Sequence, residues 1–222
     1  MKRFECSAIV FDLDGVLVDS AAYVEQQWRR WASARGLRPE PFLHVCHGRR
    51  ALETIRIAAP HLDAEAEVRA LEPRDDQNAG AIGPMAGAAR LLDALPEGTW
   101  AVATSGPRVG AMARLRRAGL PVPPVLVCAE DVSSGKPSPD VYLQAARGLD
   151  VGPSGCLVVE DAPAGIQAAR AAGMAVVALA TTHSVGELPA DACAGSLAGV
   201  HLGRVDRGVH ARTLLEVLVV EL

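Results

Sequence analysis

The chain has 222 residues, half of them hydrophobic and 22% charged, with a formal net charge of −4 and a pI near 5.9. This size fits one domain with a modest insertion, and the acidic balance together with the lack of any apolar run near ~20 residues predicts no nucleic-acid and no membrane partner. Five scattered cysteines without a C-x-x-C pair argue against a disulfide framework or a zinc site, so we expect a cytoplasmic protein.

The first predicted strand covers residues 7–11 and ends at Asp12. It is apolar throughout, as expected for a strand that is buried on both faces of a sheet. From residue 17 to residue 82 the pattern is instead that of amphipathic helices, the first of them capped by Asp19 or Ser20. The helical pieces are predicted at 20–36, 49–59 and 63–72, with a return hinge at 78–80 and 83–84.

Strands and helices alternate along the rest of the chain. Apolar runs predict strands at 100–103, 125–128, 157–159 and 175–179, and helical patterns lie at 86–95, 109–118, 141–149 and 166–172. This alternation predicts an α/β fold with a doubly wound parallel sheet, whose ligand site lies outside the carboxyl ends of the strands. We therefore predict a core of residues 1–16 and 83–222, and a helical cap of residues 17–82 inserted after the first strand.

Two aspartates follow the first strand directly, in the sequence Asp12-Leu13-Asp14-Gly15. Two carboxylates spaced two residues apart can face the same way, and the glycine allows a sharp turn. Their mutual repulsion would be relieved by a divalent cation, and magnesium suits oxygen ligands of this kind. The alternative is a solvated turn at the end of a strand, where Asp and Gly are common.

The other strand ends carry complementary groups. Glu160 and Asp161 supply further carboxylates for a metal, and residues 104–106 (Thr-Ser-Gly) offer a hydroxyl and backbone N–H groups for a phosphate. Lys136 is the only lysine besides Lys2 in a chain that otherwise uses arginine. A compact point charge is therefore indicated at this position, although an exposed turn lysine is the alternative.

Four segments together resemble the motifs of the haloacid dehalogenase-like superfamily. They are residues 11–20 (FDLDGVLVDS), 104–106 (TSG), 135–140 (GKPSPD) and 159–165 (VEDAPAG), and their order and spacing match along the whole chain. Residues 47–55 (HGRRALETI) are similar to the helical cap of the subgroup that dephosphorylates small sugar and polyol phosphates, a group that also includes glycerol phosphatases and β-phosphoglucomutase-like enzymes. The resemblance implies a Rossmann-like core with a helical cap.

The resemblance also implies a role for each motif residue. Asp12 would be the nucleophile that forms an aspartyl-phosphate, and Asp14 the general acid and base. Mg²⁺ would be held by Asp12, the Asp14 carbonyl and Asp161, with Glu160 in support. The phosphate would be held by Thr104, Ser105 and Gly106, and Lys136 would neutralise charge. The implied activity is that of a magnesium-dependent phosphatase for a small phosphomonoester, a sugar or polyol phosphate.

Three other readings remain open. A phosphomutase shares all four motifs and would return the phosphoryl group to the sugar. A true dehalogenase would lack Asp14, and a regulatory or binding module would have lost catalytic residues that are present here. In the cap, His47, Arg49 and Arg50 could contact the substrate or form a solvated face, as could the charged residues Glu72, Arg74, Asp75 and Asp76. No oligomeric state is predicted.

Overall fold

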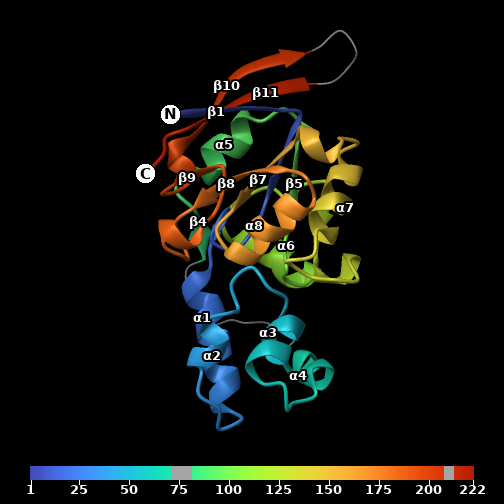
Figure 1. The fold of residues 1–222 in the computed structure, drawn as a ribbon, viewed down its shortest axis with the longest axis vertical. Coiled ribbons are helices and arrows are strands. Elements are labelled where there is room, and N and C mark those ends of the chain that lie inside the picture. The colour runs from blue at the N-terminus through green and yellow to red at the C-terminus, as the bar shows by residue number, and fades with distance from the viewer. Residues whose placement is uncertain (72–81, 208–212) are drawn as a thin grey trace.

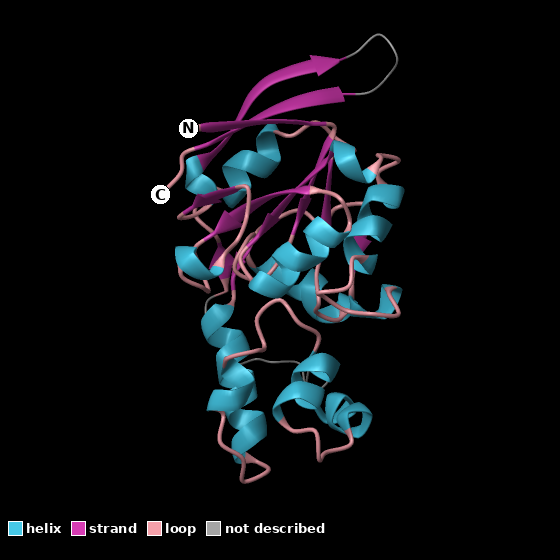
Figure 2. Ribbon diagram, in the orientation of Figure 1, coloured by secondary structure: helices cyan, strands magenta, loops and turns pink. Residues whose placement is uncertain are grey.

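The computed structural model describes residues 1–71, 82–207 and 213–222. At its centre lies a parallel sheet with the strand order β6-β5-β2-β7-β8-β9 (Figures 1 and 2). Its strands are β2 (Ala8–Phe11), β5 (Trp100–Ala103), β6 (Leu126–Val127), β7 (Cys156–Glu160), β8 (Ala175–Leu179) and β9 (Ala192–Ala194). The first five correspond to the predicted apolar runs, and β9 was not predicted. The prediction of an α/β fold with a parallel sheet is confirmed.

Helices cover both faces of this sheet, which explains why its strands are apolar without alternation. Ile9 and Phe11 of β2 pack in one buried cluster with residues of α5 and α6, and Ala8 and Val10 pack in another with residues of α7 and α8. These helices are α5 (Ala88–Ala94), α6 (Arg108–Arg117), α7 (Asp140–Gly148) and α8 (Pro163–Ala171), each within a few residues of its predicted position. Across the described ranges, none of the helices combines the length and the apolar content that crossing a bilayer requires.

A separate group of helices lies beyond the carboxyl end of β2 (Figure 1). It consists of α1 (Ala21–Ser33), α2 (Glu40–Leu43), α3 (Ala51–Ala58) and α4 (Ala64–Leu71), and we call it the cap. The cap has its own buried cluster, in which the rings of Trp28 and Phe42 stack with their centroids 5.7 Å apart. The short strands β3 (Val18–Asp19) and β4 (Gly83–Pro84) pair with each other where the chain passes between core and cap. The predicted hinge residues 78–80 and the charged residues Glu72, Arg74, Asp75 and Asp76 lie outside the described residues.

A second sheet covers the end of the core opposite the cap (Figure 1). It has the antiparallel order β1-β11-β10, formed by β1 (Lys2–Cys6), β11 (Thr213–Val219) and β10 (Val200–Arg207). Leu215, Val217 and Val219 point to the core side and are buried, whereas the residues between them are only partly buried. None of these strands was predicted: β1 and β10 contain no long apolar run, and the apolar residues 217–219 of β11 were not recognised as a strand.

Candidate active site

The polar groups expected at the strand ends meet around the carboxyl end of β2. This strand lies between β5 and β7, with Phe11 paired to Val102 on one side and Val159 on the other. Asp12, Thr104 and Asp161 therefore follow three adjacent strands at the same edge of the sheet. All three are nearly fully buried, with at most 4% of their surface exposed. The turn after Asp12 needs a glycine, because a Cβ on Gly15 would lie 2.1 Å from Asp161 Oδ2 and the backbone has a φ of +80°.

Lys136 is the hub of this buried cluster. Its ammonium group is fully buried and donates hydrogen bonds to Asp12 Oδ1, to Glu160 Oε1 at 2.7 Å and to the Ala103 carbonyl oxygen at 3.2 Å. The ring of Tyr142 lies beside it, with 4.9 Å between Nζ and the ring centroid. Although burial lowers the pKa of Lys136, the Asp12 and Glu160 carboxylates raise it above its usual value. Lys136 is thus a buried cation and not an exposed turn residue.

The Glu160 carboxylate accepts hydrogen bonds from four donors. Its Oε1 accepts hydrogen bonds from Lys136 and from the Tyr142 hydroxyl at 2.8 Å, and its Oε2 accepts from the backbone N–H groups of Asp161 and Ala162 at 2.8 and 2.9 Å. These four donors use the four lone-pair sites of the carboxylate. Although burial raises the pKa of Glu160, Lys136 lowers it below its usual value. The carboxylate of Glu160 therefore orients Lys136, and its support of a metal stays a prediction.

Asp12 and Asp161 carry negative charge that Lys136 alone does not balance. Burial raises the pKa of Asp12 to about 7, even though Lys136 lowers it. Burial, together with repulsion from Glu160 and Asp12, raises the pKa of Asp161 well above its usual range. Three buried carboxylates face one ammonium group, and a divalent cation would offset the excess. The oxygen donors present, two carboxylates and the nearby Asp14 carbonyl, suit Mg²⁺.

This donor set is incomplete by itself, as is common for magnesium. Within residues 1–71, 82–207 and 213–222, no three His, Cys, Asp or Glu side chains form a group that could hold a metal ion. Mg²⁺ usually keeps several waters and binds through one or two carboxylates plus substrate phosphate oxygens. Two threonines after β8 hold Asp161 in place, because the hydroxyls of Thr182 and Thr181 donate to its Oδ2 at 2.6 and 3.4 Å. The Thr181 hydroxyl also donates to the Gly15 carbonyl at 2.7 Å. Their position at the end of a predicted strand was the signal that could have identified them.

Asp14 is held by two residues that the sequence did not assign to it. The Ser20 hydroxyl donates to Asp14 Oδ1 at 2.6 Å, and Arg114 Nε lies 2.9 Å from the same oxygen in an ion pair. Ser20 stands at the N-cap position of α1, as predicted, but its side chain makes no capping hydrogen bond. Arg114 belongs to α6, which follows β5 and is distant from Asp14 in the sequence. No sequence spacing links Arg114 to Asp14, so only the folded arrangement reveals this contact.

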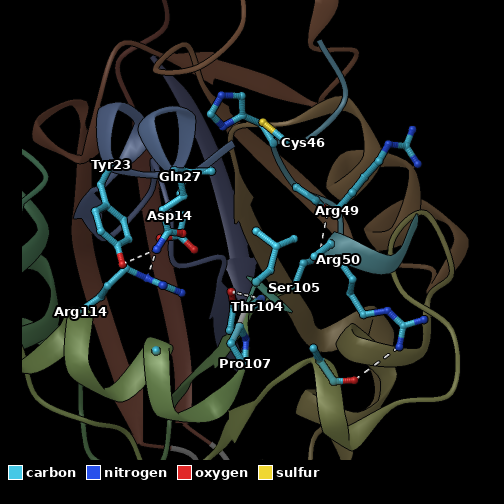
Figure 3. Close-up of a pocket in the computed structure, with 18 of the residues that line it drawn as sticks. Asp14, Tyr23, Gln27, Cys46, Arg49, Arg50, Thr104, Ser105, Pro107 and Arg114 are labelled. Carbon is cyan, nitrogen blue, oxygen red and sulfur yellow. Dashed lines mark hydrogen bonds and ion pairs between the residues drawn. The ribbon is translucent and has the colours of Figure 1, made fainter. Parts of the chain in front are cut away.

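Core and cap together enclose a cavity of about 560 Å³ in front of these groups. Figure 3 shows Asp14, Tyr23 and Arg114 at one side, Arg49 at the other, and Thr104 between them. The predicted site residues that line the cavity are Asp12, Asp14, His47, Arg49, Thr104, Ser105 and Gly106. Lys136, Glu160 and Asp161 are buried beneath this lining. The backbone N–H of Gly106 donates to the Thr104 hydroxyl at 3.1 Å, which orders the loop expected to hold phosphate.

Two contacts fasten the cap to the core at the rim of this cavity. The Ser105 hydroxyl donates to the Gly48 carbonyl at 2.9 Å, so in this conformation the hydroxyl faces the cap. Arg50 pairs with Glu53 and donates to the core carbonyls of Val132 and Ser133 at 3.1 and 3.2 Å. Arg50 therefore links cap and core, and it also lines the cavity.

His47 is enclosed between the two domains. Its ring lies 6.1 Å from that of His183 in an edge-to-face arrangement, and its Nε2 is 3.8 Å from Glu25 Oε1. Burial and the neighbouring His183 lower the pKa of His47, although Glu25 and Asp14 act in the opposite direction. His47 therefore lines the cavity as expected, with a cap carboxylate as its closest charged neighbour.

A carboxylate pair and a buried lysine lie at the carboxyl ends of a parallel sheet, and a helical cap covers them. This is the arrangement of a hydrolase with an α/β core and a helical cap. The chain belongs to the haloacid dehalogenase-like hydrolase family, whose model matches residues 6–173. This confirms the family and the hydrolase class that the four motifs predicted.

Individual relatives match over most of the chain. Hexitol phosphatase A of Escherichia coli strain K12 is 43% identical over 179 residues, covering 78% of this chain and 83% of the relative. Glycerol-1-phosphate phosphohydrolase 2 of Saccharomyces cerevisiae is 35% identical over 199 residues, covering 84% of this chain and 80% of the relative. The crystal structure of a hydrolase from Pseudomonas syringae superposes with a TM-score of 0.74 at 28% identity, covering 86% of this chain and 94% of the other.

Proposed function

We propose that this protein is a magnesium-dependent phosphatase that hydrolyses a small sugar or polyol phosphate through an aspartyl-phosphate on Asp12. The observation that carries the proposal is the ion pair between the fully buried Lys136 and Asp12, which lines the cavity between core and cap. A carboxylate nucleophile can approach a dianionic phosphate only where positive charge is concentrated. Lys136 supplies part of that charge in a site from which water is largely excluded.

Each step can be assigned to a residue of this chain. An oxygen of Asp12 attacks phosphorus while the bond to the ester oxygen breaks, and Asp14 donates a proton to the leaving alcohol. Asp14 then removes a proton from the water that attacks the aspartyl-phosphate, which restores Asp12 and releases phosphate. Thr104 and the backbone N–H of Ser105 hold the phosphate oxygens, and Lys136, oriented by Glu160, offsets their charge. Bound Mg²⁺ would supply further electrostatic stabilisation from Asp12, the Asp14 carbonyl and Asp161.

The proposed substrate class rests on the relatives and on the cavity. The two relatives at 43% and 35% identity are named for phosphates of a hexitol and of glycerol. A cavity of about 560 Å³ between core and cap has room for a molecule of that size, whereas a folded protein would be too large to enter it. Phosphate release should be measured across hexitol phosphates, glycerol phosphates, sugar phosphates, nucleotides and phosphopeptides. Preference for nucleotides or phosphopeptides would contradict the class, and conversion of one sugar phosphate into an isomer would indicate a phosphomutase. No turnover of any phosphomonoester would favour the regulatory module.

Activity should depend on magnesium, and so should stability. Because folding raises the pKa of Asp12 to about 7, its carboxyl binds a proton more tightly in the folded than in the unfolded chain. Its contribution to stability therefore falls as the pH rises from the usual pKa towards about 7. Mg²⁺ can replace that proton, so it should raise Tm more at about pH 8 than at about pH 5. At a hundredfold excess over Kd the gain would be about 2.7 kcal/mol. Full activity after exhaustive chelation, or a Tm that does not change on addition of Mg²⁺, would contradict the predicted dependence on magnesium.

Arg49 should contribute to substrate selection. It lines the cavity from the cap and forms no ion pair with the described residues, in contrast to Arg50. A lost charge-assisted hydrogen bond costs about 1.5–3 kcal/mol, so Arg49→Ala should raise KM for the preferred polyol or sugar phosphate roughly ten- to a hundredfold. KM for p-nitrophenyl phosphate, which offers no hydroxyl groups, should change little. Arg69→Ala, on the exposed surface of α4, is the matched control. Equal losses for both substrates would place Arg49 outside substrate recognition.

A further inference from the structure

Arg114 is a largely covered arginine whose place in the site follows from no motif. Its side chain is 11% exposed and lines the cavity, with Nε 2.9 Å from Asp14 Oδ1. Two glycines make room for its guanidinium group. A Cβ on Gly106 would lie 2.6 Å from Arg114 Nη2, and a Cβ on Gly110 would lie 3.2 Å from Nη1. Both glycines therefore lie directly against the guanidinium group of Arg114.

One polar atom of Arg114 is buried without a hydrogen-bond partner among the described residues. Arg114 Nε is buried yet makes no aligned hydrogen bond, so its contact with Asp14 is an ion pair without hydrogen-bond geometry. Burying an unsatisfied N–H group costs stability, and such a group in a native structure calls for an explanation. In enzymes without substrate, catalytic contacts are often poorly aligned and tighten in the complex.

The contacts of Asp14 indicate what this explanation is. Both the Ser20 hydroxyl and Arg114 Nε approach the same oxygen, Oδ1. These two contacts fix the orientation of the carboxylate and leave Oδ2 to carry the proton that a general acid must donate. A displacement of about 1 Å in a catalytic group can cost about a hundredfold in rate. A charged anchor on the opposite oxygen is therefore well suited to this task.

We propose that Arg114 is a positioning residue, which holds the acid/base carboxylate of Asp14 in place for proton transfer to and from the leaving group. The inference rests on the proposed function, in which Asp14 is the general acid and base. Arg114 acts through Asp14, so its removal should slow the step that needs the proton and should leave substrate binding largely intact. If Arg114 instead bound the substrate directly, its removal would raise KM and its effect would be independent of Asp14.

A double-mutant cycle separates these two roles. The variants are Arg114→Met, Asp14→Asn and the double variant, assayed with the alkyl phosphate that is turned over best and with p-nitrophenyl phosphate. We expect Arg114→Met to lower kcat for the alkyl phosphate about ten- to a hundredfold, with KM changed less than about threefold. Formation of the aspartyl-phosphate from p-nitrophenyl phosphate, whose leaving group needs no proton, should fall much less. When Arg114→Met is added to the Asp14→Asn variant, kcat for the alkyl phosphate should fall by less than about threefold further.

Two controls keep these outcomes distinct. Arg116→Met removes an exposed arginine from the same helix and should leave kcat unchanged. Arg114→Gln, which keeps most of the volume and polarity, repeats the cycle if Arg114→Met lowers Tm strongly. The positioning role would be refuted if the kcat losses of the two single variants multiply in the double variant. It would also be refuted if Arg114→Met raises KM and preserves kcat. Neither result would contradict the proposed phosphatase activity. If Asp14→Asn alone leaves alkyl-phosphate turnover unchanged, the acid assignment and this inference fall together.

Discussion

Asp12→Asn should abolish turnover, by on the order of 10⁴-fold or more, while the protein remains folded. An amide cannot attack phosphorus and carries no charge to bind a metal. The fold should survive because burial already disfavours the charged form of Asp12, as its raised pKa shows. Lys136 would also keep its hydrogen bonds to Glu160 and to the Ala103 carbonyl.

The measurement is kcat on the best substrate of the panel, beside a thermal melt of each variant. Asp93→Asn is the matched control, because Asp93 lies exposed on α5, away from the cavity. Substantial activity in a folded Asp12→Asn protein would refute the nucleophile assignment. A variant that fails to fold would be replaced by Asp12→Ser, which removes the same nucleophile with a smaller side chain.

Lys136→Met should damage both catalysis and stability. The ammonium group is the shared partner of two buried carboxylates, so its loss leaves Asp12 and Glu160 facing each other without compensation. Breaking a buried ion pair by removing one partner costs about 3–5 kcal/mol. At roughly 2–4 °C per kcal/mol for a chain of this size, Tm should fall by roughly 6–20 °C.

Lys2→Met, at the only other lysine of the chain, should change neither property, because Lys2 is exposed on β1. Adding Glu160→Gln to Lys136→Met removes one of the two carboxylates that have lost their ion-pair partner. The double variant should recover part of the lost stability but not the activity. Near-normal kcat in Lys136→Met would show that the lysine is a structural ion-pair partner alone.

The core of the fold could be predicted because its strands are buried on both faces. Continuous apolar runs such as residues 157–159 are typical of such strands, and the polar residues after them, including Asp12 and Asp161, mark the edge where the site forms. Strands with one exposed face, such as β10, leave only a weak signal, and the apolar residues 217–219 of β11 were not recognised as a strand, so the second sheet was missed.

The contacts within the site were harder to predict than its members. Asp19 or Ser20 was expected to cap the first cap helix, but the Ser20 hydroxyl donates to Asp14. The four hydrogen-bond donors around Glu160 were not predicted either. Arg114 lies 100 positions after Asp14, and nothing in a single sequence distinguishes it from the neighbouring arginines of α6. Residue types and strand ends can be read from a sequence, whereas the partner of each polar atom depends on the folded chain.

The distribution of lysines has a practical consequence for labelling and immobilisation. Lys136 is fully buried and Lys2 is exposed, and the sequence contains no other lysine. An amine-reactive dye or solid support therefore finds a single reactive side chain in the folded protein. Lys2 lies in the sheet at the end of the molecule opposite the cap (Figure 1). A molecule tethered there would present its cap and cavity to the solution.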